Sequence, residues 1–267
     1  MSDWVQAVVL ALVQGFTEFL PISSSAHLVL PALLFGWEDQ GLAFDVAVHV
    51  GTLLAVVLYY RSELWQMTVS CTALLRGQPV NGDVRLVGYL ALATVPVCVA
   101  GFLADAYVES QLRTLPVIAT TTLVFGLLLG LADWRARSGA RGMPLVAGVA
   151  LVIGLAQALS LVPGVSRSGI TISAGLLLGL DRATAARFAF LLSIPVIAGA
   201  GLLKGLQLVE QSAPVDWLLL SVSALVAAVT AYGCISLFLR LLERLGLMPF
   251  VYYRIALAGL LYALWLV

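Results

Sequence analysis

The chain has 267 residues, of which 61% are hydrophobic and only 10% are charged, and its mean hydropathy is +1.05. Soluble domains carry about a quarter charged residues, so this composition excludes an ordinary soluble domain and is typical of a polytopic helical membrane protein. The 14 basic and 14 acidic residues balance to a net charge of zero, which argues against a nucleic-acid partner.

Polar residues divide the chain into ten apolar segments. Two of them, 26–36 and 169–180, are shorter than the roughly 17 to 20 helical residues that cross a bilayer, and each follows a break rich in proline, serine or glycine. Broken backbone at membrane depth must be surrounded by protein or water. We therefore predict an all-α membrane protein with six transmembrane helices and two re-entrant helical hairpins. The segments cover residues 4–20, 26–36, 44–60, 84–104, 115–132, 145–162, 169–180, 187–203, 215–239 and 250–267.

Basic residues alternate between the expected loops. Loops 105–114 and 204–214 hold only Arg113 and Lys204, whereas the loops on the other side hold most of the arginines. By the positive-inside rule, the arginine-rich side is cytoplasmic and both termini lie outside. The charges do not distinguish a hairpin from two complete spans, because both return the chain to the same side. The arginine-rich loops contain Arg61, Arg76 and Arg85, then Arg135, Arg137 and Arg141, then Arg182 and Arg187, and finally Arg240 and Arg244.

The chain contains an internal repeat that appears when it is shifted by 143 residues. Gln14 then falls on Gln157, Ser23 on Ser166, Ser24 on Arg167 and Ser25 on Ser168. Each copy lies at the tip of a predicted hairpin that is followed by three spans. Because three is odd, the second copy enters the membrane from the opposite face. We expect an inverted-topology repeat, about 1–134 and about 145–267, within a single membrane domain.

The polar residues of the first repeat gather in the sequence QGFTEFLPISSSAH. Gln14 and Glu18 are four residues apart and share one helix face. A proline then ends this helix, and a serine among Ser23–Ser25 can cap the next helix, whose first turn includes His27. This segment therefore combines a carboxylate, hydroxyls and an imidazole at a predicted helix N-terminus.

The second repeat has the same plan in the sequence PGVSRSGIT. Ser166–Ser168 precede the next helix, Gly169 permits close approach, and Thr171 lies in the first turn. Two helix N-termini would then face each other inside the membrane, and their free N–H groups and partial positive charges favour an anion, above all phosphate. Arg167 adds a guanidinium that matches phosphate oxygens. An arginine at this depth costs about 3 kcal/mol unless it is compensated, and Glu18 and an anionic ligand are the available compensators.

Structural explanations compete with these functional ones. A serine or threonine in a membrane helix usually bonds to its own backbone or to a neighbouring helix. A Glu18–Arg167 ion pair could simply join the two hairpins, and His27 could only pack. We interpret His49 as structural, with lining of a pocket as the alternative.

Several other patterns favour structural roles. The motifs Gly126xxxGly130, Gly175xxxGly179 and Gly201xxxGly205 are typical of close helix packing. Asp133 and Asp181 lie beside arginines and are interpreted as solvated loop charges. The three cysteines lack the spacing of a disulfide framework or a zinc site. The N-terminus lacks a basic segment and a small-residue cleavage site, so we expect it to be retained.

Two long motifs, QGFTEFLPISSSAHL and PGVSRSGITIS, closely resemble the signatures of the bacterial undecaprenyl pyrophosphate phosphatase family, which is known for bacitracin resistance. The similarity extends over essentially the whole chain, including the closing FVYYR. It implies a plasma-membrane hydrolase that removes the terminal phosphate of a C55 lipid pyrophosphate, uses a divalent cation such as Mg²⁺ or Ca²⁺, and opens toward the periplasmic or outer face. Gln14 departs from the family, in which many members have Glu, and an amide cannot act as a base, so any role as a base that this Glu would have rests on Glu18 alone. Ala26 stands where many members have Gly.

The resemblance, together with the expectation that the two hairpin tips face each other, gives a set of candidate residues. Three nucleophiles stay open: Ser24 with His27 or Glu18 as the base, which we favour, His27 itself, or a water activated by Glu18 or a metal. The candidate catalytic residues are Glu18, Ser24, His27 and Arg167, with Glu18 also a candidate metal ligand. The candidate substrate-binding residues are Gln14, Ser23, Ser25, Ser166, Ser168, Gly169 and Thr171.

Two other functions remain compatible with the sequence. Inverted repeats with broken helices are common in secondary transporters, so a transporter or lipid flippase for a phosphorylated substrate is the main alternative. A non-catalytic lipid-binding scaffold fits less well, because acidic, basic and imidazole groups converge. The sequence leaves the oligomeric state open, with a homodimer as one alternative.

Overall fold

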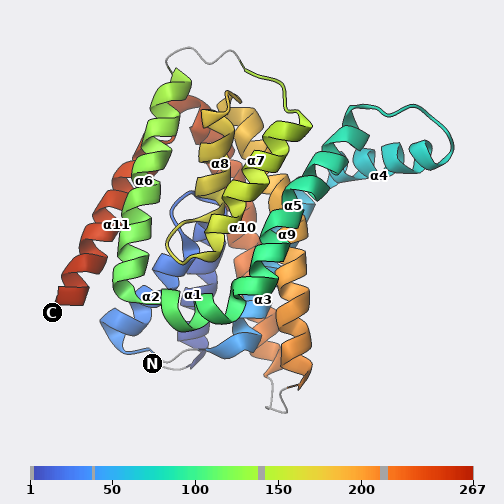
Figure 1. Ribbon diagram of the computed structural model, residues 1–267. Helices are drawn as coiled ribbons and strands as arrows, with labels where there is room; N and C mark the ends of the chain where they lie inside the picture. Colours follow the sequence, from blue (N-terminus) through green and yellow to red (C-terminus); the bar gives the residue numbers. More distant parts are fainter. Residues whose placement is uncertain (1–2, 38–39, 138–141, 211–215, 267) are drawn as a thin grey trace.

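A computed structural model describes residues 3–37, 40–137, 142–210 and 216–266, and in these ranges it contains helices and no strand (Figure 1). The all-α class is therefore confirmed. The helices are α1 (Asp3–Thr17), α2 (Ser24–Phe35), α3 (Gly41–Tyr59), α4 (Arg61–Leu75), α5 (Gly82–Tyr107), α6 (Leu115–Arg137), α7 (Ala147–Ala158), α8 (Arg167–Leu177), α9 (Arg182–Glu210), α10 (Trp217–Leu245) and α11 (Met248–Leu266), with a π-helical turn η1 (Val108–Leu112) and a 3-10 turn η2 (Leu159–Leu161).

Six helices are long and apolar enough to cross a membrane: α3, α5, α6, α9, α10 and α11. At most 44% of the apolar window of any of them is buried inside the protein. The remaining side chains face outward, where only lipid can solvate such apolar surfaces. The prediction of six transmembrane helices is confirmed.

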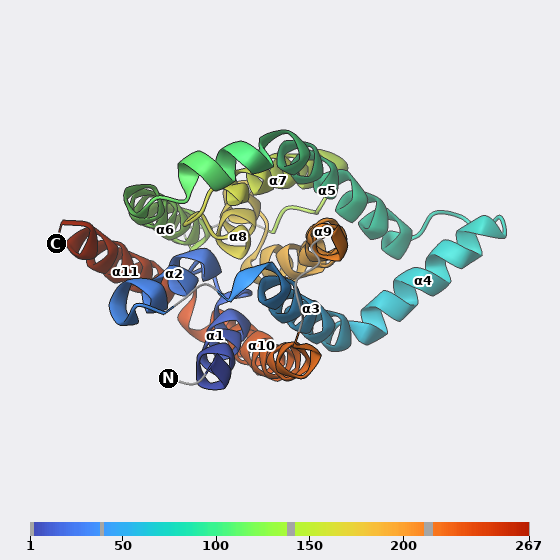
Figure 2. The ribbon, with the colours of Figure 1, turned by 90° about the horizontal axis from the view of Figure 1, so that it is seen from below.

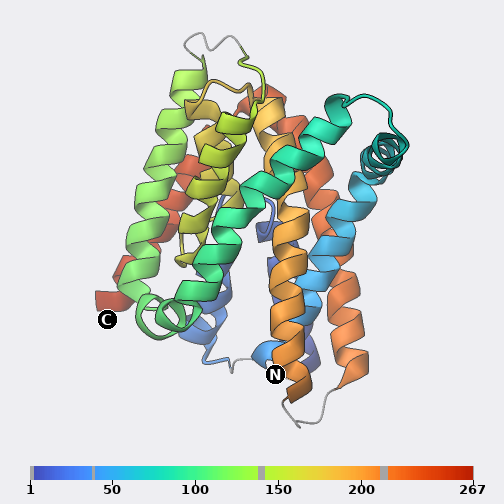
Figure 3. The same cartoon turned by 45° about the vertical axis from the view of Figure 1, so that its right-hand side comes forward.

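The remaining helices of the bundle form two hairpins that are too short to span it. α1 and α2 have 15 and 12 residues, and α7 and α8 have 12 and 11. The loop of the first hairpin rises to the middle of the bundle, and the loop of the second descends to the same level (Figures 1 and 3). The broken backbone of both hairpins thus lies inside the protein, as the membrane interior demands.

The packing of the helices follows the inverted repeat. Helices α1, α2, α3, α5 and α6 of the first repeat correspond to α7, α8, α9, α10 and α11 of the second. α1 packs on α10 and α7 packs on α5, so each hairpin packs against a helix of the other repeat. Corresponding helices also pack against each other, α3 against α9 and α6 against α11. α4 has no counterpart and projects away from the bundle, whereas α8 lies near its middle (Figure 2).

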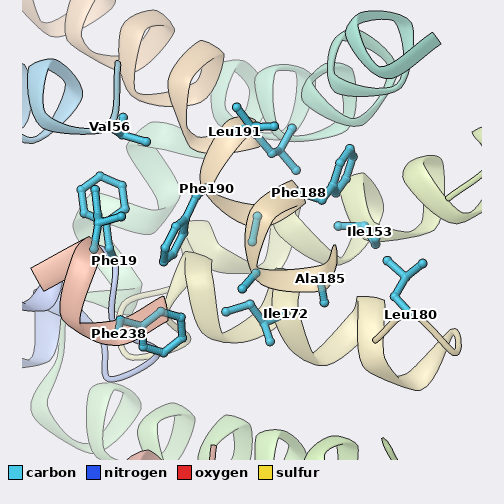
Figure 4. Close-up of a cluster of buried hydrophobic side chains, with 14 of the residues drawn as sticks. Phe19, Val56, Ile153, Ile172, Leu180, Ala185, Phe188, Phe190, Leu191 and Phe238 are labelled. Atoms are coloured by element: carbon cyan, nitrogen blue, oxygen red, sulfur yellow. The ribbon is translucent and has the colours of Figure 1, made fainter. Parts of the chain in front are cut away.

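An aromatic cluster fixes the first hairpin tip against the bundle. The ring of Phe190 in α9 lies 5.5 Å from Phe19 and 5.5 Å from Phe238 (Figure 4). All three rings are buried. Because Phe19 follows Glu18 directly, this packing limits the positions that the Glu18 backbone can adopt.

The expectation of close helix packing holds for some of the glycine motifs and fails for others. The Gly126xxxGly130 motif faces α11, where added Cβ atoms would lie 2.9 Å from the Arg254 Cβ and 3.2 Å from Val251 Cγ1. The Gly175xxxGly179 motif also has close neighbours. Added Cβ atoms in the Gly201xxxGly205 motif would have no atom within 4 Å. Close helix packing is therefore confirmed for the first motif and for Gly175, which packs against Ala185 of α9. It is wrong for Gly179, which lies in the turn after α8 with φ 91°, and for the third motif among the described residues.

One charge that we interpreted as solvated is buried. Asp133 is fully buried and forms ion pairs with Arg137 at 3.0 Å and with Arg182 at 2.6 Å. The interpretation of Asp133 is therefore wrong, because Arg137 of its own helix and Arg182 at the start of α9 both pair with its buried carboxylate. Asp181 does lie in an exposed turn, where it accepts hydrogen bonds from the Thr184 backbone N–H and hydroxyl. Partial burial raises the pKa of Asp181, but these hydrogen bonds outweigh it and lower the pKa below its usual range.

Candidate active site

The two hairpin tips share an unusual backbone geometry. Ser23 has φ 72° and ψ 99°, and Ser166 has φ 71° and ψ 114°. They are the non-glycine residues with positive φ in the described ranges, and the repeat shift relates one to the other. Each such conformation costs about 1–3 kcal/mol and persists only when surrounding structure enforces it. The strain therefore marks both tips as places where the fold serves a purpose beyond its own stability.

Glu18 lies at the centre of the polar contacts between the tips. Arg167 Nη2 donates to Glu18 Oε1 at 3.0 Å, which joins the second hairpin to the first. Gln14 Nε2 donates to Glu18 Oε2 at 2.9 Å, and the hydroxyl of Ser24 donates to the same oxygen at 3.1 Å. Glu18 and Gln14 are buried. The structure thus brings four of the predicted site residues into one connected group.

Ser24 and His27 lie in the first turn of α2 but have different partners. The Ser24 hydroxyl points to the carboxylate of Glu18. His27 Nδ1 donates to the Ser23 carbonyl at 2.7 Å, which leaves its Nε2 to accept from the Tyr253 hydroxyl at 2.6 Å. The His27 and Tyr253 rings are parallel, with centroids 5.5 Å apart. In this arrangement Glu18, and not His27, is placed to take a proton from Ser24.

Ser25 and Ser168, which the repeat relates, tie the tips together. The backbone N–H of Gly164 donates to Ser25 Oγ at 3.1 Å, and Ser168 Oγ donates to the Leu20 carbonyl at 2.8 Å. Each of these serines also contacts the strained serine of its own tip, at 3.1 Å for Ser23 and 3.3 Å for Ser166. These contacts are reciprocal between the hairpins, so the two tips form one unit.

The remaining predicted site residues lie in or next to the first turn of α8. Ser166 Oγ accepts from the Gly169 N–H at 3.1 Å and therefore caps α8, whereas Ser23 makes no such cap for α2. The expected serine cap is thus present in the second hairpin. The expectation that a serine among Ser23–Ser25 caps α2 is wrong, because the N-cap residue is Ser23 and its hydroxyl contacts Ser25 instead. Thr171 Oγ1 donates to the Arg167 and Ser168 carbonyls within its helix.

Two buried polar atoms beside Glu18 have no hydrogen-bond partner among the residues that the structure describes. They are Arg167 Nη1, a donor, and Gln14 Oε1, an acceptor. A buried polar group without a partner costs about 1–3 kcal/mol. Because one atom can bind a phosphate oxygen and the other can bind a cation or a donor, both are suited to a bound ligand.

A cavity of about 430 Å³ adjoins this group. Its polar lining includes Gln14, Ser24, Ser25 and His49. Its apolar lining comes mainly from α1, α2 and α3, and Arg113 also lines it. A cavity lined by both polar and apolar side chains suits an amphiphile with a polar head.

His49 is part of the site and does not only pack between helices. Its Nδ1 donates to the Asp45 carbonyl at 2.7 Å, so its Nε2 accepts from Gln14 Nε2 at 3.2 Å. His49 also lines the cavity. The pocket-lining alternative is therefore correct, and the sequence signal for it was a histidine within a predicted span.

Sequence reasoning missed Arg254 as part of the site. Arg254 is fully buried in α11, and its guanidinium donates to backbone carbonyls of both tips. The signal was present, because an ionisable residue inside a predicted span is by default a functional candidate. It is the final residue of the FVYYR sequence.

The repeat builds one polar centre rather than two. The counterparts of Glu18, His27 and His49 are Leu161, Ile170 and Leu192, all apolar. The counterpart of Ser24 is Arg167, which reaches back to the first tip. Each hairpin therefore supplies different chemical groups to a common site.

The chain offers few metal ligands of its own. The described residues contain no group of three or more His, Cys, Asp or Glu side chains that could hold an ion. Glu18 and the unpartnered Gln14 Oε1 are oxygen donors of the type that Mg²⁺ and Ca²⁺ prefer. One carboxylate with substrate phosphates is a normal way to bind Mg²⁺, so the donor set fits an ion that arrives with its substrate.

Comparison with known proteins gives a consistent result. Residues 7–260 match the family model described as bacitracin resistance protein BacA. An undecaprenyl-diphosphatase of Alcanivorax borkumensis is 57% identical over 264 residues, which cover 99% of each chain. Undecaprenyl-diphosphatases of Hahella chejuensis and Teredinibacter turnerae are 53% and 52% identical, over 97% of this chain and 97% and 98% of theirs.

Proposed function

The chain belongs to the bacitracin resistance protein BacA family, and we propose that it is a membrane phosphatase that hydrolyses undecaprenyl diphosphate to undecaprenyl phosphate and inorganic phosphate. The product is the lipid carrier that cell-wall synthesis uses again. One observation carries the proposal for the site: Glu18 contacts Ser24 of its own hairpin and Arg167 of the opposite hairpin. This arrangement would supply Ser24 as a nucleophile, Glu18 as a base and Arg167 as a phosphate-binding cation, with Glu18 in hydrogen-bond contact with the other two.

The substrate would bind with its diphosphate at the tips and its prenyl chain along the apolar lining of the cavity. The helix N-termini of α2 and α8 favour negative charge, and Arg167 Nη1 is free to bind a phosphate oxygen. These groups would also stabilise charge on the leaving phosphate as it develops.

The first step is attack by Ser24 Oγ on the terminal phosphorus. Its proton passes to Glu18 Oε2, which already accepts its hydrogen bond at 3.1 Å. The bond between the terminal phosphorus and the bridging oxygen breaks, and undecaprenyl phosphate leaves. Water then attacks the phosphoserine, the protonated Glu18 returns its proton to the departing Ser24 oxygen, and both hydrogens of the water leave in the inorganic phosphate.

The other polar residues orient Ser24 and Glu18. Gln14 donates to Glu18 Oε2 and is held by His49 Nε2, so it fixes the carboxylate plane. His27 holds the Ser23 carbonyl next to Ser24. A divalent cation would bind to Glu18 and Gln14 Oε1 together with the substrate phosphates, and it would neutralise phosphate charge.

We propose that the cavity opens to the outer face of the plasma membrane. Both termini lie at the end of the bundle opposite the α4–α5 connection and the turn between α8 and α9 (Figure 1). The arginine-rich loops lie at the latter end, with Arg141 outside the described residues. The positive-inside rule then assigns that end to the cytoplasm, and the cavity residue Arg113 lies between α5 and α6 at the other end.

Hydrolysis in detergent separates this function from transport, because a micelle has no compartments. Purified protein with a long-chain prenyl diphosphate and Mg²⁺ should release phosphate. Arg167→Ala and Glu18→Gln should each lower kcat/KM by about 100-fold or more, because one loses phosphate charge stabilisation and the other loses the base. Glu63→Gln, which removes a partly exposed ion-pair partner of Arg187 far from the tips, is the control and should keep normal activity. Absence of phosphate release by the folded wild-type protein would instead support the transporter alternative.

A further inference from the structure

Arg254 makes an unusually complete set of hydrogen bonds to backbone carbonyls. Nε donates to Thr122 at 3.1 Å, and Nη2 donates to Gly164 at 2.8 Å and to Thr121 at 3.4 Å. Nη1 donates to Val165 at 3.1 Å and to Pro21 at 3.3 Å. An arginine side chain has five N–H donors, so every donor has an acceptor. Because Arg254 is also fully buried, it has no N–H group left for a substrate.

The five carbonyls belong to three separate parts of the protein. Pro21 is in the first tip, Gly164 and Val165 are in the second, and Thr121 and Thr122 are in α6. Among the hydrogen bonds of the described residues, no other side chain from outside the two hairpins reaches both tips. A single guanidinium thus fixes the position of one tip relative to the other and relative to α6.

These bonds act next to the two strained serines. Val165 directly precedes Ser166, and Pro21 lies two residues before Ser23. Holding those carbonyls restricts the peptide planes that lead into each positive-φ residue. Such strained conformations relax unless neighbouring groups over-determine them.

The residue after each strained serine is a reacting or binding group. Ser24 follows Ser23, and Arg167 follows Ser166. If either serine relaxed to an ordinary φ, the direction of the next side chain would change. The Ser24 to Glu18 and Arg167 to Glu18 contacts, at 3.1 Å and 3.0 Å, would then be lost or lengthened.

Two glycines make room for the Arg254 side chain. A Cβ at Gly126 would lie 2.9 Å from the Arg254 Cβ, and a Cβ at Gly169 would lie 3.1 Å from its Nη1. Both distances are shorter than ordinary carbon contacts, so a larger residue would displace the guanidinium. Gly169, which we predicted to bind substrate, is thus explained by its contact with Arg254.

We propose that Arg254 is a positioning residue that holds the two tips in their strained conformations and thereby aligns Ser24 and Arg167 for phosphoryl transfer. This inference rests on the proposed phosphatase function. Arg254 acts through the backbone and does not touch the substrate. Lysine at this position would keep the charge but could not reach three parts of the protein at once, because its ammonium is a single point with three donors.

The test compares wild type, Arg254→Lys, Ser23→Gly and the double variant in detergent. Arg254→Lys should lower kcat by about 100-fold, the size of effect that a misplacement of about 1 Å produces, with KM changed less than about threefold. Glycine adopts positive φ without strain, so Ser23→Gly in the Arg254→Lys background should raise kcat again by at least about fivefold. Ser23→Gly in the wild-type background supplies the reference kcat for this comparison, since it also removes the hydroxyl that contacts Ser25. Arg182→Lys, in the Asp133 cluster away from the tips, is the matched control and should leave kcat unchanged.

Hydrogen exchange at the tips supplies a second readout that does not depend on activity. Peptides covering 19–25 and 163–169 should exchange faster in Arg254→Lys than in wild type, and the 19–25 peptide should slow again in the double variant. Normal kcat in Arg254→Lys, or a loss of kcat that Ser23→Gly does not restore, would overturn the proposal.

If wild type itself releases no phosphate, the proposed function fails, and the exchange rates alone decide the role of Arg254. Should Arg254→Lys not fold, Gly126→Ala displaces the same side chain, and it should lower kcat in the same direction without raising KM.

Discussion

The residues at the tips differ in their hydrogen-bond partners, and these partners indicate which of them could take part in the chemistry. Glu18 uses both carboxylate oxygens, one toward Arg167 and one toward Gln14 and Ser24. His27 uses both ring nitrogens elsewhere, on the Ser23 carbonyl and the Tyr253 hydroxyl. A histidine with its acceptor nitrogen occupied is poorly placed to take a proton from Ser24. These contacts support the proposal that Glu18 is the base.

Tyr253→Phe tests this assignment at the residue scale. The substitution removes the hydroxyl that donates to His27 Nε2 and keeps the parallel ring. If Glu18 is the base, kcat should stay within about threefold of wild type, while stability falls by roughly 1 kcal/mol for one lost hydrogen bond. Phosphate release and thermal unfolding in detergent measure the two effects. A decrease in turnover by about 30-fold or more would indicate that His27 Nε2 takes part in the chemistry.

The residue types at the site and the Glu18–Arg167 pair were predictable, but the partners of His27 and Arg254 were not. The spacing of Gln14 and Glu18 and the helix-breaking prolines are local, so they are readable from the sequence. The contacts of His27 with Tyr253 and of Arg254 with both tips join residues far apart in the chain. Such pairs depend on how α11 packs against the hairpins, which no local pattern encodes.

At the scale of elements, length decided which helices could be predicted. The six spans and two short hairpins follow from apolar segment lengths, and all of them are present. α4 was expected to be a loop, because Arg61–Leu75 mixes charged, polar and apolar residues without a long apolar run. Its helix forms because its buried Met67 packs against the core and Ser70 bonds to Asp83 of α5.

The ion pairs that join elements should differ in strength according to burial. Asp133 is fully buried between Arg137 and Arg182, whereas the Glu63–Arg187 pair that joins α4 to α9 is partly exposed. Removing one member of a buried pair leaves charge without compensation. Asp133→Asn should therefore destabilise the protein by about 2–3 kcal/mol, since partial exposure of both arginines reduces the full penalty.

Glu63→Gln is the matched comparison for Asp133→Asn and should cost less than about 1 kcal/mol. Thermal unfolding of both variants in one detergent measures the difference. Equal stability of the two variants would show that burial of Asp133 has no energetic consequence.

At the scale of the whole molecule, neither repeat can form the site alone. Each hairpin packs on a helix of the other repeat, and each supplies groups that the other lacks. The repeat shift predicted the pairing of the tips, and the nearly equal φ values of Ser23 and Ser166 agree with it. The shift also shows that the first tip carries the carboxylate and the second the cation, since Glu18 falls on Leu161 and Ser24 on Arg167. Which atoms of these groups meet depends on how the tips pack, and no local pattern encodes that.

The proposed orientation makes a prediction about access from outside. In a cysteine-free background, Arg113→Cys should react with a membrane-impermeant maleimide in intact cells, because Arg113 lines the cavity at the proposed outer end. Arg76→Cys, in the exposed turn after α4, should react only after the cells are opened. The reverse pattern would place the cavity on the cytoplasmic side.

The central claim is that Ser24, activated by Glu18, attacks the terminal phosphorus, and trapping of the phosphorylated enzyme tests it most directly. Wild-type protein is mixed with a prenyl diphosphate labelled in its terminal phosphate, quenched within one turnover in acid and in alkali, and digested for mass spectrometry. Labelled phosphate should be found on Ser24 under acid quench and should be absent from Ser24→Ala protein. Label on His27 under alkaline quench, or full turnover by Ser24→Ala protein, would contradict the account.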